Sequence, residues 1–399
     1  MSRPVIHALL GNSQHPEYGS ATIPFPLSRE EYPNSLELLS ALEIGDAVCQ
    51  DCTVLSIQTE WTSLWVLEGQ SVNVDELDYL AKRLDSFSKG ETAQFEGMAD
   101  LLKLKDIKDL INLTFCCQRA TVITDFSNLE EVGKTHYMNL HGGCVPAEEL
   151  ENLDGVETAH LLIRDDSGTV TPYGVVYDNG MKLEQHYDGR HFPCYHYDDS
   201  LIVAGVTSCY APRDETPKDW IYLPASQCQI DRVLARAGIQ STDEAILCGF
   251  ENTLPAAVEQ SLVLESESIE AINDLCAVIT PLDPKERTKL EAVVAMAAPN
   301  SAAQITYLAE NLDKFNFVPG VHTPEEYGRY MIQESGRFEY DDNLEGFYDF
   351  EGYARQQMSQ ELGQFVENGY ISYHGFLSLE EVMAGSRTFE EGFQMGGMQ

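Results

Sequence analysis

The chain repeats itself at one fixed spacing. A shift of 195 positions aligns the two halves without a gap and superimposes Leu39 on Leu234, Ile44 on Ile239, Leu113 on Leu308, Gly168 on Gly363 and Gly174 on Gly369. The repeated unit runs from about Leu38 to about Tyr177, which is the size of a domain and far longer than the 20–50 residues of a solenoid repeat. We therefore interpret the chain as a tandem duplication.

The duplication predicts how the 399 residues divide. A chain of this length exceeds what one hydrophobic core organises, so more than one domain is expected. We predict a first copy over residues 1–178, a β-rich insert and linker over 179–218, a second copy over 219–378 and an acidic mobile tail over 379–399. Residues 179–218 contain alternating apolar residues that predict a β-hairpin followed by a turn-rich linker.

Hydrophobic periodicity predicts an α+β fold, with small mixed sheets and helices in each copy. Residues 52–58, 64–67 and 245–250 alternate as short strands do. Apolar residues at helical spacing predict a buried stripe in each copy, formed by Val74, Leu77, Leu80, Ala81 and Leu84 and by Ile269, Ile272, Leu275, Cys276 and Ile279. Ser28, Ser226 and Thr323 are expected to cap helices, and Pro324 follows Thr323 at the first helical position.

A net charge of −40 is shared almost equally between the copies. Residues 1–178 carry 29 acidic and 11 basic side chains, and residues 219–399 carry 30 and 10. The chain is 43% hydrophobic and contains no long block of like charges, so the acids are expected on folded surfaces rather than in a disordered segment. Direct binding to nucleic acid needs a basic surface and is not expected.

A folded surface with this many carboxylates permits mimicry of nucleic acid. Duplex DNA carries one negative charge per about 1.7 Å of its axis, so 40 charges correspond to about 20 base pairs. A protein that presents such an array is attracted to the basic grooves of DNA-binding enzymes.

The sequence contains no complete motif for an enzymatic activity, a metal site or a targeting signal. Phosphate-binding loops, nucleophile elbows and zinc-protease motifs are absent, so we expect no catalytic residue and no cofactor. A zinc site formed by His186, His191, Cys194 and His196 stays open, and with it a metal-dependent hydrolase. Asp341-Asp342-Asn343 and the Cys49–Cys52 pair lack the rest of a calcium or zinc site. Irregularly spaced cysteines, and no stretch typical of a signal peptide or membrane span, predict a cytoplasmic protein.

Three segments of the second half resemble the ArdA antirestriction family. They are Gln304 to Leu312 (QITYLAENL), Phe317 to Tyr330 (FVPGVHTPEEYGRY) and Tyr348 to Arg355 (YDFEGYAR). The last departs from the family heptad at Phe350, Gly352 and Ala354, and Gln356 follows it. By the shift of 195, residues 75–81, 106–113 and 128–134 resemble the same family, whereas Asp154 to His160 (DGVETAH) diverges from the heptad. The resemblance thus covers two tandem copies.

This resemblance implies a function and a set of residues. ArdA proteins are acidic, elongated, three-domain DNA mimics without enzymatic activity that occupy the DNA-binding site of type I restriction-modification enzymes, and plasmids, transposons and phages carry them. The family pattern carries over to Glu325, Glu326, Gly328, Arg329, Tyr330, Asp349, Glu351, Tyr353 and Arg355, and in the first copy to Glu130 and Glu131. Core packing of the two tyrosines and ion pairing of the two arginines within the chain are the structural alternatives.

The resemblance also implies a partner, the DNA-binding groove of a type I methyltransferase. The two fused copies would act as a monomeric pseudo-dimer, or the chain would form a homodimer. The alternative is an acidic inhibitor or adaptor of another basic nucleic-acid enzyme, such as a CRISPR effector or a nucleoid protein.

Overall fold

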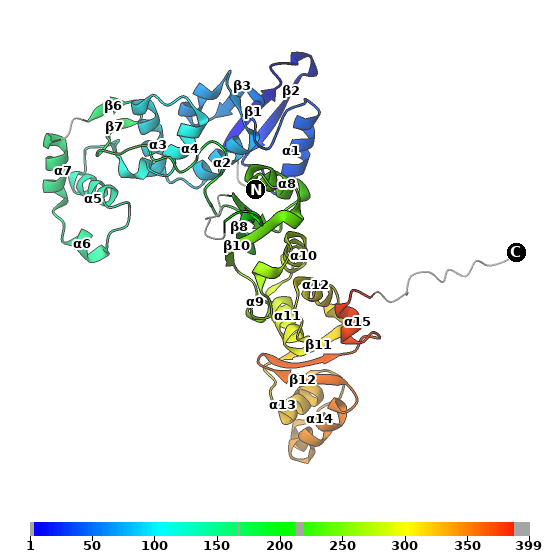
Figure 1. Ribbon diagram of the computed structural model, residues 1–399. Coiled ribbons are helices and arrows are strands. Elements are labelled where there is room, and N and C mark those ends of the chain that lie inside the picture. Colours follow the sequence, from blue (N-terminus) through cyan, green and yellow to red (C-terminus); the bar gives the residue numbers. More distant parts are fainter. Residues whose placement is uncertain (1–3, 166–167, 213–218, 387–399) are drawn as a thin grey trace. The chain divides into compact units, whose positions relative to one another are not determined.

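The computed structural model describes residues 4–165, 168–212 and 219–386, which divide into two compact units (Figure 1). Unit 1 comprises the described residues of 1–198, 218–220 and 226–240, and unit 2 comprises those of 199–217, 221–225 and 241–399. Helices and small antiparallel sheets alternate in both units, so the fold class is α+β as predicted. None of the helices in these ranges is long and apolar enough to cross a membrane.

Unit 1 begins with an antiparallel sheet of four strands in the order β2-β1-β3-β4. These are β1 (Ile6–Gly11), β2 (Ser20–Phe25), β3 (Cys52–Thr59) and β4 (Ser71–Val72), and α1 (Glu31–Ser40) joins β2 to β3. Residues 64–67 were predicted as a strand, and this is wrong, because they belong to the 3₁₀ turn η2 (Thr62–Leu67). Leu64 and Leu67 are both fully buried, and a 3₁₀ turn places residues three apart on the same side.

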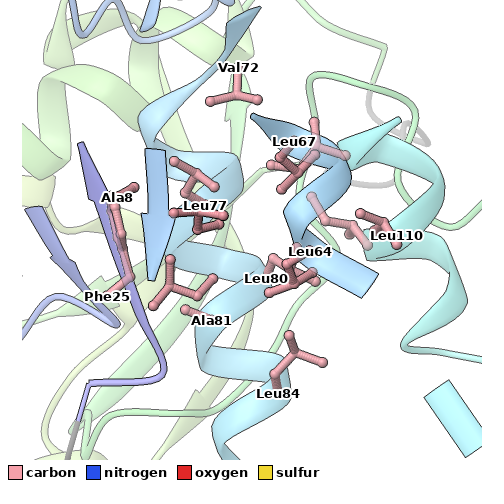
Figure 2. Close-up of a cluster of buried hydrophobic side chains, with 14 of the residues drawn as sticks. Ala8, Phe25, Leu64, Leu67, Val72, Leu77, Leu80, Ala81, Leu84 and Leu110 are labelled. Carbon is pink, nitrogen blue, oxygen red and sulfur yellow. The ribbon is translucent and has the colours of Figure 1, made fainter. Parts of the chain in front are cut away.

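Three helices follow this sheet in the chain: α2 (Val74–Asp85), α3 (Lys89–Leu102) and α4 (Ile107–Leu113). The predicted apolar stripe of α2 is confirmed, since its five residues are at most 1% exposed. Figure 2 shows Leu77, Leu80 and Ala81 between the strands that carry Ala8 and Phe25 and the neighbouring helical segments. Each buried leucine of this kind stabilises the fold by about 1.5–3 kcal/mol.

A further part of unit 1 is a small sheet with three helices. The strands β5 (Thr121–Ile123), β6 (Thr169–Thr171) and β7 (Gly174–Tyr177) have the order β5-β7-β6. Between β5 and β6 the chain forms α5 (Leu129–Leu140), α6 (Ala147–Glu151) and α7 (Gly155–Asp165). Helices α5 and α7 pack against each other over a minor core.

A β-hairpin followed by a linker was expected within residues 179–218, where residues 181–198 contain no strand and residues 202–208 form one. Side chains rather than a strand ladder hold residues 181–198 on unit 1. Tyr187 exchanges two hydrogen bonds with the Asn112 side chain, and its hydroxyl donates to Glu76 at 3.1 Å. Phe192 stacks on Tyr187 and on Tyr79 of α2. The aromatic residues that suggested a strand therefore serve as anchors to the helices.

Helix α8 (Gln227–Ala237), with the predicted Ser226 cap, completes unit 1. Its Arg232 and Arg236 donate to buried Asp75 at 2.9 and 2.7 Å, and Arg232 also donates to the Gly45 and Asp46 carbonyls. Burial raises the pKa of Asp75, but the two guanidinium groups outweigh burial and the pKa is lowered overall. The carboxylate is therefore the ionic anchor of α8.

Unit 2 begins with the sheet β10-β8-β9, formed by β8 (Ile202–Ser208), β9 (Asp219–Leu223) and β10 (Ala245–Asn252). Four helices follow: α9 (Ala256–Gln260), α10 (Ile269–Ile279), α11 (Pro284–Ala297) and α12 (Ala302–Glu310). The predicted stripe of α10 is confirmed, since all five of its residues are buried.

The last part of unit 2 contains a second small sheet. The strands β11 (Phe315–Pro319), β12 (Leu362–Val366) and β13 (Gly369–Tyr373) have the order β11-β13-β12. Between β11 and β12 lie α13 (Pro324–Arg329), the π-helical turn η7 (Tyr330–Glu334), the 3₁₀ turn η8 (Asp342–Phe347) and α14 (Phe350–Met358). In the segment expected as a mobile tail, α15 (Leu379–Met383) is a helix, and residues 387–399 lie outside the described ranges.

Several backbone features recur at positions 195 apart. Lys103 and Ala298 both have a left-handed backbone at the ends of α3 and α11. Gly174 and Gly369 both have positive φ and face the carbonyls of Ile123 and Val318 respectively, where no Cβ would fit. The sheets β5-β7-β6 and β11-β13-β12 also share one strand order.

Candidate functional site: the acidic face of α13 and α14

Helix α13 begins as the sequence predicts. The Thr323 side chain accepts a hydrogen bond from the Glu326 amide, and the Glu326 carboxylate accepts from the Thr323 amide at 3.1 Å. Glu326 also accepts from the His322 amide at 2.7 Å, and these backbone bonds lower the pKa of its carboxyl group. Glu326 is therefore engaged in the cap, whereas the Glu325 carboxylate next to it lies exposed.

Helices α13 and α14 pack closely because Gly328 has no side chain. A Cβ at Gly328 would lie far inside van der Waals contact with the Phe350 carbonyl oxygen. The Asp349 side chain caps α14 by accepting from the Gly352 amide at 2.8 Å. The carboxylates at the start of α14 are thus brought beside those of α13.

Arg329 links three elements of this region. Its guanidinium donates to Glu325 of α13 at 3.1 Å and to Glu345 of η8 at 2.7 Å. The same guanidinium lies over the ring of Phe350, 4.5 Å from the centroid. The hydrogen bonds that Arg329 donates to Glu345 and then to Glu325 raise the pKa of Arg329, so it stays cationic. The ion pairing expected from the sequence is present.

Arg355 and Glu351 form a simpler pair on one turn of α14. The Arg355 guanidinium donates to Glu351 at 2.7 Å, and both side chains are more than half exposed. An exposed pair four residues apart on a helix contributes about 0.3–0.5 kcal/mol. This pair is therefore a surface feature of α14 with little effect on its stability.

The tyrosines of the family motif belong to the packing behind this face. Tyr330 and Tyr353 are half-buried and pack against the core cluster that contains Tyr327 and Tyr370. The Tyr327 and Tyr370 hydroxyls both donate to Glu361 at 2.9 Å, and burial raises the pKa of both phenols. Glu361 and Glu345 were not predicted from the sequence, because nothing in their spacing distinguishes them among 65 acidic residues.

The equivalent region of the first half has a simpler surface. Glu130 pairs with Lys134 at 2.7 Å, and Glu131 is exposed after the Asn128 cap. By the shift of 195, Val156 and His160 occupy the positions of Glu351 and Arg355, and Val156 is 39% exposed. At these two positions the first half therefore lacks the ion pair that Glu351 and Arg355 form in the second.

Acidic side chains of α13, η8 and α14 gather around one place on the surface. A shallow hollow is lined by four carboxylates and one guanidinium, from Glu325, Glu345, Asp349, Glu351 and Arg329, with Gly346, Tyr348 and Phe350. The lining holds no serine, cysteine or histidine that could serve as a nucleophile or general base. Such a surface can attract basic side chains.

The alternative metal centre is not assembled. His186 pairs with Glu184 at 2.9 Å, His191 pairs with Asp219 at 2.8 Å, and Cys194 lies 3.7 Å from His196. Within residues 4–165, 168–212 and 219–386, no group of three or more His, Cys, Asp or Glu side chains could hold a metal ion. These side chains fasten residues 184–196 and their neighbours rather than forming one site.

Replacement of Thr323 by alanine is expected to destabilise unit 2 by about 1 kcal/mol, because it removes the N-cap of α13. Chemical denaturation followed by the fluorescence of the aromatic cluster around Tyr327 measures this loss. Thr323→Ser keeps the hydroxyl and is the matched control, expected to retain most of the stability. Equal losses for both variants would show that the cap contributes nothing.

Comparison with known proteins identifies the region that contains this site. Residues 215–372 match the profile of the antirestriction protein (ArdA) family, and α13, α14 and the hollow lie inside the match. A comparison with curated proteins gives no significant match. Residues 215–372 of this chain are therefore similar to the ArdA antirestriction family.

Proposed function

We propose that this antirestriction protein is a DNA mimic that acts without catalysis by occupying the DNA-binding groove of a type I restriction-modification enzyme. One observation carries the proposal: within the region that matches the family, the carboxylates of α13, η8 and α14 surround one hollow at defined positions. The proposed site of action is the cytoplasm, where such an enzyme meets DNA.

Electrostatics supports this proposal. The chain has a net charge of −40, and the dispersed carboxylates reproduce the sign and the approximate number of charges of a DNA site of about 20 base pairs. DNA releases its condensed counterions when a basic groove binds it, and a surface of carboxylates competes for the same basic side chains. The binding energy is then spread over many contacts, so most single carboxylate changes have small effects.

We further propose that the chain is a tandem duplication, with copies at 1–178 and 219–378 joined by 179–218. The features that recur 195 positions apart, in the left-handed residues and in the strand order of the small sheets, support a common origin. Two copies in one chain could replace the two subunits of a homodimer. A mass measurement in solution tests this, since an obligate dimer of the full chain would remove the pseudo-dimer proposal.

Competition with DNA is the expected behaviour. The purified protein is expected to displace labelled cognate DNA from a type I modification methyltransferase, and the affinity of the enzyme for this protein, obtained from the competition, should fall steeply as salt rises from about 50 to about 200 mM, as its affinity for DNA does. Fluorescence anisotropy of the DNA across a salt series measures it. If the folded protein displaces no DNA at any salt concentration, the type I target is wrong and another basic nucleic-acid enzyme becomes the candidate.

A further inference from the structure

We propose that Arg329 is a positioning residue that fixes the spacing of the carboxylates on the acidic face of α13 and α14. This inference deepens the proposed function and rests on it for the binding effect. It concerns a basic residue in an acidic protein, whose positive charge by itself opposes the mimicry of DNA.

The contacts of Arg329 distinguish it from an ordinary surface arginine. Its guanidinium reaches Glu325 on its own helix and Glu345 on η8, 16 residues later in the sequence. It also lies over the ring of Phe350, which is 5% exposed and is the first residue of α14. One side chain therefore ties α13, η8 and the start of α14 together.

The Arg329 guanidinium offsets the repulsion between neighbouring carboxylates. Glu325, Glu345, Asp349 and Glu351 line one hollow, and like charges at such short range repel each other. Without a cation between them, Glu325 and Glu345 would turn away from each other into solvent. The guanidinium holds both carboxylates beside the same hollow, at a spacing that the protein rather than the partner determines.

Arg355 provides an internal comparison. It pairs only with Glu351 one turn earlier on α14 in the contacts of the described residues, and its side chain is 66% exposed, against 39% for Arg329. Loss of Arg355 frees one carboxylate on a helix that already fixes its position. Loss of Arg329 frees η8 from α13.

At the equivalent positions of the first half, the described residues form different contacts. Lys134 occupies the position of Arg329 and pairs with Glu130 of its own helix at 2.7 Å. Leu150 and Gly155 stand at the positions of Glu345 and Phe350, so these positions supply neither the distant carboxylate nor the aromatic ring. We infer that the positioned array of carboxylates belongs to the second half.

Whether binding becomes weaker or tighter in the variants distinguishes a positioning role of Arg329 from an effect of net charge. Arg329→Gln and Arg355→Gln each make the protein more negative by one charge. If only total charge determined binding to a basic groove, both variants would bind as well as the unmodified protein or more tightly. If Arg329 positions carboxylates, Arg329→Gln should bind about three- to tenfold more weakly in spite of its added negative charge.

The experiment measures DNA displacement from a type I methyltransferase by full-length protein, Arg329→Gln, Arg329→Lys and Arg355→Gln. The proposal expects weaker displacement by Arg329→Gln, little rescue by Arg329→Lys, which keeps the charge but not the planar fork, and no loss for Arg355→Gln. Equal or stronger displacement by Arg329→Gln, or full rescue by Arg329→Lys, overturns it.

Hydrogen exchange of the free proteins keeps the test independent of the target. Backbone amides of residues 342–348 are expected to exchange severalfold faster in Arg329→Gln than in Arg355→Gln, with unchanged exchange in α10 and α12. Unchanged exchange at 342–348 overturns the positioning role. If the unmodified protein displaces no DNA, the proposed target fails, and the exchange result alone decides whether Arg329 holds η8 in place.

Discussion

Replacement of Asp75 by alanine is expected to destabilise unit 1 by about 3–5 kcal/mol, because it removes the buried carboxylate that Arg232 and Arg236 share. The hydroxyl of Tyr32 also donates to this carboxylate and would lose its acceptor. Urea denaturation, followed by circular dichroism, measures the change. An effect below about 1 kcal/mol would show that α8 is held by its apolar contacts alone.

Glu270→Gln is the matched control for Asp75→Ala. Glu270 stands 195 positions after Asp75, at the equivalent place in α10, but its side chain is exposed. Its removal is expected to change stability by less than about 0.5 kcal/mol. A comparable loss for both variants would mean that the effect reflects position in the helix rather than the buried ion pair.

The Asp75 effect depends on pH in a defined direction. Because its folded-state pKa is lowered below the ordinary value of 3.8, its contribution is fully present above that value and is lost as pH falls through the folded-state pKa. The difference in unfolding free energy between Asp75→Ala and the unmodified protein should therefore be constant above about pH 5 and shrink in stronger acid.

The pKa values of two neighbouring carboxyl groups are shifted in the opposite direction to that of Asp75. Burial raises the pKa of Asp78 and of Glu76, and it does so in spite of Lys82 beside Asp78 and of the Asn73 amide beside Glu76. Their protonation stabilises the folded state in mild acid. The loss of stability of unit 1 as pH falls is therefore smaller than the loss due to Asp75 alone. Comparison of the variant with the unmodified protein removes this background.

Replacement of Gly328 by alanine is the second change with a large expected effect. It is expected to destabilise the protein, although a change from glycine to alanine inside a helix is usually stabilising. Alanine is favoured over glycine in the interior of a helix by about 1 kcal/mol. At Gly328 the new methyl group would collide with the Phe350 backbone, so α13 and α14 must separate and unit 2 should lose about 1–3 kcal/mol. Thermal unfolding by calorimetry measures this loss.

Two further glycines make this prediction specific. A methyl group at Gly346 would meet no described atom within 4 Å, so Gly346→Ala should be nearly neutral. Gly133 meets the Gly155 backbone in the first half as Gly328 meets Phe350 in the second, so Gly133→Ala should destabilise unit 1 similarly. A neutral Gly328→Ala would contradict the close packing of α13 on α14.

Much of the helical fold was predictable because buried helices leave a periodic signal. The stripes of α2 and α10 and the cap at Thr323 were visible in the sequence and are confirmed. Segments without amphipathic periodicity could not be predicted in this way. Strand β1 lies in the amino-terminal segment, where no strand was predicted. Residues 64–67 resembled a strand, because a spacing of two residues and a spacing of three are hard to distinguish over four residues.

The contacts between distant segments could not be predicted. Residues 181–198 contain the aromatic residues of a strand, but Tyr187 and Phe192 bind to helices that only the folded chain brings near. Likewise, the sequence indicated that Arg329 would form an ion pair, and nothing in it identified Glu345 as one of the partners. The family motif marked the helices of the site, whereas Glu345, which completes the array, comes from outside the motif.

Mutually exclusive binding is the most direct consequence of DNA mimicry. Native mass spectrometry of a mixture of type I methyltransferase, its cognate DNA and this protein distinguishes the possible complexes by mass. The account predicts two separate complexes, enzyme with DNA and enzyme with this protein, whose ratio follows the ratio of the two competitors. A ternary complex that contains the enzyme, the DNA and this protein together would contradict it.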